Sequence, residues 1–318
     1  MQELTTSLTL EGIERRRGRS LMFHAAGLAD PVTGSTAALV AASGTGKTTA
    51  TRRLGRTLAY VTDETVCVDP DELSIVPYPK PLSVVRRPGE PKEQVSPDEL
   101  GLLPLDATAR LNALLLLERS PDEQAPTVTE PLPLVTALST LVPNISALPS
   151  LPRPLETLLR VIDACGGVRA VRYREIDDVA ESIARIAASP AVPTVRREPP
   201  RAWSPDPAAA TATEDTAGAT SNAVALGPWV EALENPEDPS QVLVLLPEQL
   251  VVLAGIAPVL WHECRERGPL SLDALTDALV ASYGSNPEAR QLTRECVGRL
   301  RALEVLQPEA VRGAPAVE

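Results

Sequence analysis

The chain has 318 residues, which is enough for one large domain or two domains of ordinary size. Its 43% of hydrophobic residues can form a core, which excludes a wholly disordered protein. Its 30 basic and 42 acidic side chains give a formal net charge of −12. Such an acidic balance argues against a nucleic-acid partner, because phosphates are bound by basic surface.

The N-terminal half of the sequence alternates between strand and helix patterns. Short apolar runs predict strands at 36–41, 60–61, 66–68 and 168–173. Helical patterns follow at 48–58, 154–164 and 177–188. The apolar run 111–117 fits either a buried strand or a helix segment, since periodicity does not separate the two. The alternation predicts an α/β domain over residues 1–188, with helices packed on a sheet.

The second half of the sequence begins with a change in composition. Prolines give way to small and polar residues over 189–222, a composition that predicts a flexible linker. The remaining segment, 223–318, has the size of one small domain. Two strand patterns (241–246 and 250–253) are followed by three helix patterns (255–266, 271–283 and 287–303). Strands followed by three helices are typical of a small α+β winged-helix domain.

Three features bear on where the protein works. Residues 1–20 carry charges and no apolar run, so no signal peptide is expected. The apolar stretch 241–261 contains Pro247, Glu248 and Pro258, and its uncharged part is shorter than the ~18 residues of a membrane span. The four cysteines form no CxxC pair, which indicates reduced thiols. We therefore expect a soluble cytoplasmic protein with no membrane partner.

Residues 41–48 read A-A-S-G-T-G-K-T, the spacing of a Walker A loop with Ala41 in place of the first glycine. The backbone N–H groups of such a loop surround phosphate oxygens, and its lysine contacts the β and γ phosphates. The start of the next helix adds positive charge. The predicted nucleotide-binding residues are Ser43, Gly44, Thr45, Gly46, Lys47, Thr48 and Thr49. The alternative is a glycine- and threonine-rich turn without a ligand.

Two adjacent carboxylates, Asp63 and Glu64, follow the strand pattern at 60–61. A magnesium nucleotide needs a carboxylate near its phosphates, so Thr48, Asp63 and Glu64 are predicted Mg²⁺ ligands. The alternative is a solvated turn between strands. His24 is interpreted as a core histidine rather than a catalytic one, and Lys80, between two prolines, as a rigid loop contact.

These segments resemble the HPr kinase/phosphorylase type of P-loop protein. The similar stretches are F-H-A-A at 23–26, the loop at 41–49, Y-V-T-D-E-T-V at 60–66 and V-P-Y-P-K-P-L at 76–82. The resemblance covers about residues 20–185 and includes related proteins of bacterial clusters for ribosomally made, modified peptides. It implies Mg²⁺·ATP binding, with Lys47 and Asp63 as catalytic residues if the protein is a kinase. Glu64 stands where active kinases usually have a second aspartate.

Residues 241–306 resemble PqqD-like peptide-recognition domains. The similar stretches are L-L-P-E-Q-L-V-V-L-A-G, A-P-V-L-W-H-E-C, L-D-A-L-T-D-A-L and V-G-R-L-R-A-L-E-V-L. The resemblance implies that a leader peptide adds as a strand to the sheet edge and packs against the last helix. The implied peptide-binding residues are Leu250, Val251, Val252, Arg290, Arg294 and Arg301. The alternative is a DNA-binding winged helix, which the absence of Lys and Arg from 271–283 disfavours.

Together the two resemblances predict a leader-recognition protein of ribosomal-peptide modification. It would act as an adaptor that delivers the precursor peptide to a separate modifying enzyme, such as an oxidoreductase. The alternative is an ATP-dependent kinase that phosphorylates a hydroxyl of the precursor peptide. Ala41 and Glu64 favour the adaptor, whereas the intact Gly46-Lys47-Thr48 sequence favours the kinase.

Overall fold

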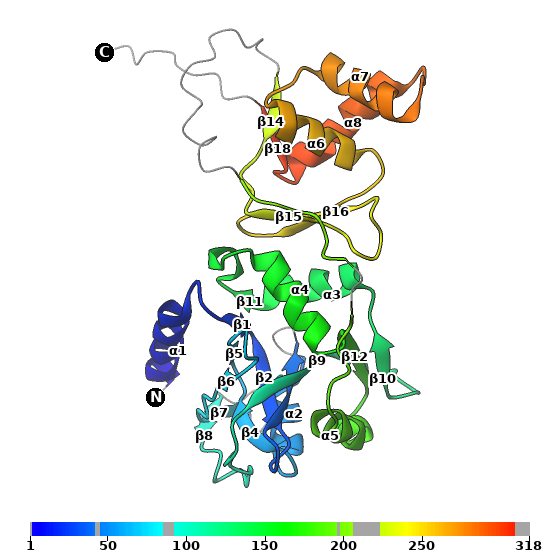
Figure 1. Ribbon diagram of the computed structural model, residues 1–318. Helices are drawn as coiled ribbons and strands as arrows, with labels where there is room; N and C mark the ends of the chain where they lie inside the picture. Colours follow the sequence, from blue (N-terminus) through cyan, green and yellow to red (C-terminus); the bar gives the residue numbers. More distant parts are fainter. Residues whose placement is uncertain (1, 42–44, 85–91, 196–197, 206–222, 309–318) are drawn as a thin grey trace, which may run out of the picture. The chain divides into compact units, whose positions relative to one another are not determined.

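The computed structural model describes residues 2–41, 45–84, 92–195, 198–205 and 223–308. The chain divides into two units, Met1–Arg197 and Glu198–Glu318, which we call the N-terminal and C-terminal units. Figure 1 shows the helices and strands of both. The N-terminal unit is a mixed α/β structure, and the C-terminal unit combines a small antiparallel sheet with three helices.

The N-terminal unit is built on a mixed six-stranded sheet of order β10-β12-β9-β3-β2-β4. Strands β12, β9 and β3 run parallel, and the other pairings are antiparallel. The strands are β2 (Ala25–Ala29), β3 (Ser35–Val40), β4 (Ala59–Thr62), β9 (Arg110–Arg119), β10 (Thr127–Pro131) and β12 (Val168–Tyr173). The carboxyl ends of the three parallel strands therefore meet at one edge, where α/β folds commonly bind ligands.

One face of this sheet is covered by α2 (Lys47–Leu54) and α5 (Ala180–Ala188). Leu39 of β3 and Leu115 of β9 are fully buried in the core beneath these helices. The side chains of a strand point alternately to its two faces, and the intervening Ala38 and Leu114 are buried as well. Both faces of the central strands are thus apolar, which explains why the run 111–117 carries no period-two pattern.

The N-terminal unit contains further strands and helices. Two further sheets have the orders β11-β1-β5-β6 and β7-β8. Their strands are β1 (Leu21–Phe23), β5 (Val66–Val68), β6 (Ile75–Val76), β7 (Leu82–Val84), β8 (Glu93–Val95) and β11 (Ile145–Ser146). The other helices are α1 (Gln2–Arg16), α3 (Leu134–Leu141), α4 (Pro154–Ala164) and the 3-10 turns η1 (Val142–Asn144), η2 (Leu148–Ser150) and η3 (Ile176–Val179).

The C-terminal unit contains an antiparallel sheet of order β13-β15-β16-β17 and a second strand pair, β14-β18. The strands are β13 (Ala202–Trp203), β14 (Val224–Leu226), β15 (Glu231–Glu234), β16 (Val242–Leu245), β17 (Leu250–Leu253) and β18 (Leu306–Pro308). The helices are α6 (Ala257–Arg267), α7 (Leu272–Tyr283) and α8 (Ala289–Ala302). Apolar residues of these helices share one core with the sheet, and Trp261 is fully buried in it.

Most predicted elements are confirmed, with shifts at their ends. The helix at 154–164 and the strand at 168–173 have the predicted bounds, and the ambiguous run 111–117 is a strand. The helix predicted at 48–58 ends at Leu54, where Gly55 is the C-cap residue and its backbone N–H donates to the Thr51 carbonyl oxygen. Helix α1 was not predicted.

The prediction of one flexible linker over 189–222 is wrong for its described part. The backbone N–H of Ala191 donates to Asn112 Oδ1, and that of Thr194 donates to the Asp163 carbonyl oxygen, so this stretch is tied to the N-terminal unit. Further on, Ala202–Trp203 forms β13 and pairs with β15. Residues 206–222 lie outside the described part of the chain. Within that part, no helix is both long and apolar enough to cross a membrane.

Candidate functional site

The predicted phosphate loop lies at the carboxyl end of β3, where it connects to α2. Gly46 precedes the helix with a φ of 94°, in the left-handed region, and Lys47 is the first helical residue. Thr45 and Thr48 are half-buried and Thr49 is exposed. The predicted residues Ser43 and Gly44 lie outside the described residues. The observed part of the loop thus has the strand–loop–helix setting that phosphate loops require.

Gly46 offers a test of this backbone geometry. A Cβ there would meet no atom closer than 3.9 Å, so a side chain has room and only the φ of 94° opposes it. We expect Gly46→Ala to reduce the free energy of unfolding by about 1–2 kcal/mol. Gly298→Ala in α8, where a Cβ meets nothing within 4 Å, is the control and should stabilise by up to about 1 kcal/mol. Urea denaturation of both variants measures this, and equal effects would contradict the conformation of Gly46.

Lys47 is half-buried and directs its ammonium group to backbone carbonyl groups. Its Nζ donates to the carbonyl oxygen of His24 at 3.2 Å and to that of Ala41 at 3.5 Å. Burial lowers its pKa to about 8, although the charges of Asp63 and Glu64 act in the opposite direction. No carboxylate lies within ion-pair distance of this ammonium group among the described residues, so its charge is available to an anion.

The two predicted carboxylates are held by Lys80. Its Nζ lies 3.4 Å from Asp63 Oδ1 and 2.7 Å from Glu64 Oε2. The side chains of Lys80 and Asp63 are only 8% and 3% exposed, while Glu64 is 36% exposed. Burial acts to lower the pKa of Lys80, but the two carboxylates outweigh it and the net shift is upward. Burial raises the pKa of Asp63, with Lys80 opposing the shift.

Tyr60 and the two prolines beside Lys80 fix this arrangement. The Tyr60 hydroxyl donates to the Lys80 carbonyl oxygen at 3.0 Å and lies 3.4 Å from Asp63 Oδ1. Burial raises the pKa of Tyr60, so it stays a hydroxyl donor. Proline restricts its own φ and the conformation of the residue before it, so Pro79 and Pro81 restrict the loop that carries Lys80. Lys80 is therefore a loop contact as predicted, but its carboxylate partners were not predicted.

His24 connects the loop to the carboxylates. It lies between β1 and β2, its backbone oxygen accepts from Lys47, and its side chain is half-buried. Burial and the charge of Lys47 lower its pKa, so the imidazole is neutral near pH 7. It therefore adds no charge to the group formed by Lys47, Asp63, Glu64 and Lys80.

Two residues near the loop were missed by the sequence analysis. A Cβ on Gly46 would lie 3.9 Å from Arg119 Cδ and 4.0 Å from the Tyr173 hydroxyl oxygen. Arg119 ends β9 and Tyr173 ends β12, and these positions are paired across the two parallel strands. Arg119 also pairs with Glu175 at 3.0 Å. Their positions at the ends of two apolar strand patterns could have predicted this, because the carboxyl ends of parallel strands meet at the ligand-binding edge of a sheet.

The residues predicted to bind Mg²⁺ fit that ion poorly in this arrangement. Mg²⁺ requires oxygen ligands at about 2.0–2.1 Å in a near-octahedral shell. Here the oxygens of Asp63 and Glu64 already surround an ammonium group. Within the described ranges, no group of three or more His, Cys, Asp or Glu side chains is placed to hold a metal ion.

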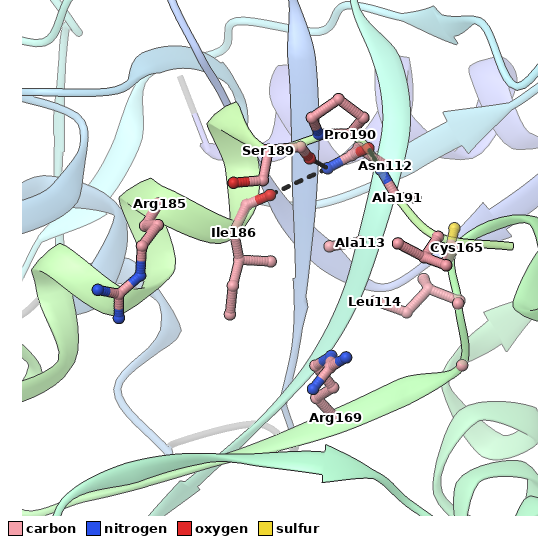
Figure 2. Close-up of a pocket in the computed structure, with 13 residues that line it drawn as sticks. Asn112, Ala113, Leu114, Cys165, Arg169, Arg185, Ile186, Ser189, Pro190 and Ala191 are labelled. Atoms are coloured by element: carbon pink, nitrogen blue, oxygen red, sulfur yellow. Dashed lines mark hydrogen bonds between the residues drawn. The ribbon is translucent and has the colours of Figure 1, made fainter.

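A separate cavity of about 310 Å³ lies at the opposite, amino-terminal ends of β9 and β12. Figure 2 shows Asn112 at its border, donating to the carbonyl oxygens of Ile186 and Ser189. Arg169 and Arg185 also line it. None of the predicted site residues does, so this cavity is distinct from the loop at the carboxyl ends of the strands.

In the C-terminal unit, the predicted peptide-binding strand is at a sheet edge. β17 pairs with β16 on one side, and no other strand of the described residues pairs with it. Leu250 and Val252 are half-buried, whereas Val251 is buried in the core with the helices. The Gln249 side chain donates to the Leu303 carbonyl oxygen at 3.1 Å, which places the end of the last helix beside the start of the edge strand.

The three predicted arginines of α8 differ in their surroundings. Arg290 forms an ion pair with Asp273 of α7, so it joins two helices of its own unit. Arg294 and Arg301 are exposed and lie seven residues apart, which places them on one face of the helix. These two arginines are therefore the better placed for an acidic partner.

An aromatic cluster lies in the core of the same unit. Trp261 contacts Trp203 and Trp229 edge to face, with ring centroids 5.6 and 5.4 Å apart. His262 packs against Trp203, and Arg265 lies over the Trp203 and Trp261 rings. Burial and the charge of Arg265 lower the pKa of His262. Trp261 is therefore an anchor of this core.

Comparison with known proteins gives weak structural similarity. No protein-family model matches the chain, and no curated protein matches it. Among solved structures, the HPr(Ser) kinase/phosphatase from Coxiella burnetii shares 12% sequence identity with it. The match covers 52% of this chain and 93% of that protein, with a TM-score of 0.30. Similarity at this level assigns no activity to the chain.

Proposed function

We propose that the protein recognises the leader of a precursor peptide and delivers the peptide to a separate modifying enzyme. The observation that carries the proposal is the edge strand β17, which offers an unpaired side among the described residues. An extended peptide can add there by main-chain hydrogen bonds, while neighbouring side chains select its sequence. Leu250 and Val252 would contact apolar residues of the leader, and Arg294 and Arg301 acidic ones.

The N-terminal unit supports an adaptor more than a kinase. A kinase needs a carboxylate that can accept the proton of the acceptor hydroxyl. Asp63 is the carboxylate among the predicted catalytic residues, yet it is buried, lies against Lys80 and accepts from the Tyr60 hydroxyl. We therefore assign the loop at Gly46 and Lys47 to binding the phosphates of ATP, with the bound nucleotide stabilising the unit rather than donating phosphate.

Hydrogen exchange of the full-length protein tests peptide capture. A candidate precursor peptide is added, and backbone amide exchange is followed by mass spectrometry. Exchange is expected to slow in Leu250–Leu253, because an added strand accepts hydrogen bonds from the unpaired backbone N–H groups of the edge strand. β15, an interior strand of the same sheet, is the internal control. Binding that protects another surface and leaves β17 unchanged would contradict the proposal.

The phosphate loop is tested by the pH dependence of ATP binding. Only the ammonium form of Lys47 attracts phosphate, and its pKa in the free protein is about 8. As the pH rises above about 8, affinity should fall towards tenfold per pH unit, and binding should take up a proton. Calorimetric titration in two buffers of different ionisation enthalpy measures this uptake. Lys47→Met should bind weakly at every pH, and an unchanged pH profile in that variant would exclude Lys47 as the origin.

A peptide kinase remains the second candidate, because Gly46, Lys47 and Thr48 keep the spacing of an active loop. Incubation with ATP, Mg²⁺ and the precursor peptide, followed by mass spectrometry, separates the two. Transfer of phosphate to the peptide, lost in Lys47→Met and in Asp63→Asn, would establish the kinase and overturn the adaptor.

A further inference from the structure

We propose that the Lys80 ammonium group takes the place of a divalent metal ion beside Asp63 and Glu64, so that the loop at Lys47 binds phosphate groups without Mg²⁺. The nucleotide part of this inference rests on the proposed function. Its metal part stands on the geometry of the three side chains alone. Lys80 contacts both carboxylates, at 3.4 and 2.7 Å, from a position that is 8% exposed.

The charges of the site are already balanced. Lys47 and Lys80 contribute two positive charges, and Asp63 and Glu64 contribute two negative ones, so the group sums to zero. A divalent cation beside these carboxylates would bring the sum to +2 and face both ammonium groups at short range. The metal ion would also have to displace the Lys80 ammonium group from the carboxylate oxygens of Asp63 and Glu64, which would be its ligands. The arrangement therefore opposes metal binding electrostatically and sterically.

The backbone of Lys80 is fixed by hydrogen bonds and by two prolines, which keeps its ammonium group beside the carboxylates of Asp63 and Glu64. The Tyr60 hydroxyl donates to its carbonyl oxygen, and its own backbone N–H donates to the Tyr78 carbonyl oxygen at 2.9 Å. Pro79 and Pro81 restrict the backbone on either side. A departing ammonium group would leave Asp63, 3% exposed, as a buried charge without a cation. The internal cation is thus a fixed part of the site.

Lys47 is then the group that meets the anion. It donates only to backbone carbonyl oxygens in the contacts given above, and it begins a helix whose N-terminus carries positive potential. Lys80 keeps the neighbouring carboxylates from repelling phosphate. In nucleotide sites a bound metal ion holds the phosphates and also neutralises nearby negative charge, and Lys80 supplies the second of these functions.

Two measurements on the full chain test the proposal. The first is calorimetric titration of ATP into the wild-type protein in excess Mg²⁺ and in EDTA. Affinities that agree within about threefold support the proposal, whereas a loss of about tenfold or more in EDTA overturns it. If ATP binds under neither condition, the proposed nucleotide role fails and the second measurement alone decides the role of Lys80.

The second measurement is Mn²⁺ binding without nucleotide, followed by electron paramagnetic resonance. Lys80→Met and Lys80→Gln remove the ammonium group, and the glutamine can still donate to the carboxylates if the methionine variant does not fold. Either variant should bind Mn²⁺ about tenfold or more tightly than wild type. Lys92→Met, at an exposed lysine, is the control and should match wild type. Wild-type binding that Asp63→Asn removes, or folded Lys80 variants without the gain, would overturn the proposal.

Discussion

Replacing Lys80 by methionine should destabilise the N-terminal unit by about 3–5 kcal/mol. The reason is that Asp63 stays behind as a buried carboxylate, 3% exposed, without its cation. Glu64 suffers less, because its partly exposed side chain can be hydrated. Urea denaturation followed by far-ultraviolet circular dichroism measures the loss, and the transition of the N-terminal unit is the one expected to move.

Two further variants separate this effect from a general loss of packing. Lys92→Met changes the same residue type at an exposed position and should cost less than about 0.5 kcal/mol. The double variant Asp63→Asn/Lys80→Met removes both buried charges and should recover most of the stability, since a pair replaced by neutral residues costs little. A loss below about 1 kcal/mol in Lys80→Met, or no recovery in the double variant, would show that the ion pair is not buried in solution.

Introducing lysine at Val252 should weaken peptide capture by about 100-fold. Natural proteins protect free sheet edges with lysine, because a charged side chain there opposes the addition of another strand. The Val252 side chain is half-buried on the edge strand, so a lysine there can reach solvent in the free protein and would place its charge beside an added strand. Titration of a fluorescent precursor peptide into each variant gives the dissociation constants.

Ala254→Lys is the matched control for this edge. Ala254 is exposed and follows β17 directly. The lysine of this variant therefore adds the same charge one position beyond the strand. Its peptide affinity should stay within about threefold of wild type. Arg294→Glu/Arg301→Glu changes one exposed face of α8 and should weaken binding of an acidic leader, whereas Arg299→Glu, on another face of the helix, should not. Equal peptide affinity in Val252→Lys and wild type would exclude strand addition at β17.

Local patterns were sufficient to predict most of the elements that position the site. The strand before the loop, the helix after it and the last three helices all follow from apolar periodicity and turn residues. The helix after the loop was predicted too long: it ends at Leu54, and Gly55, a poor helix former, is its C-cap residue. Helix α1 was missed because its threonine-rich sequence carries little amphipathic pattern.

The contacts within the site were harder to predict than its residues. Lys80 is one of only three lysines in the chain. Its contact with Asp63 and Glu64, however, depends on a loop that returns to the end of β4. Such a contact is set by the whole fold and leaves no trace in local periodicity. Strand β13 was missed for the same reason. Its Trp203 packs on Trp261 and pairs with β15, although the composition of the surrounding segment predicts a linker.

The aromatic cluster has a spectroscopic consequence. All three tryptophans of the chain, Trp203, Trp229 and Trp261, lie in the C-terminal unit, so their emission is a built-in label for that unit alone. Peptide binding at β17 can be followed by emission without a dye. A change of emission when ATP is added would show that the N-terminal unit communicates with the C-terminal one, and an unchanged spectrum would show that the two respond independently.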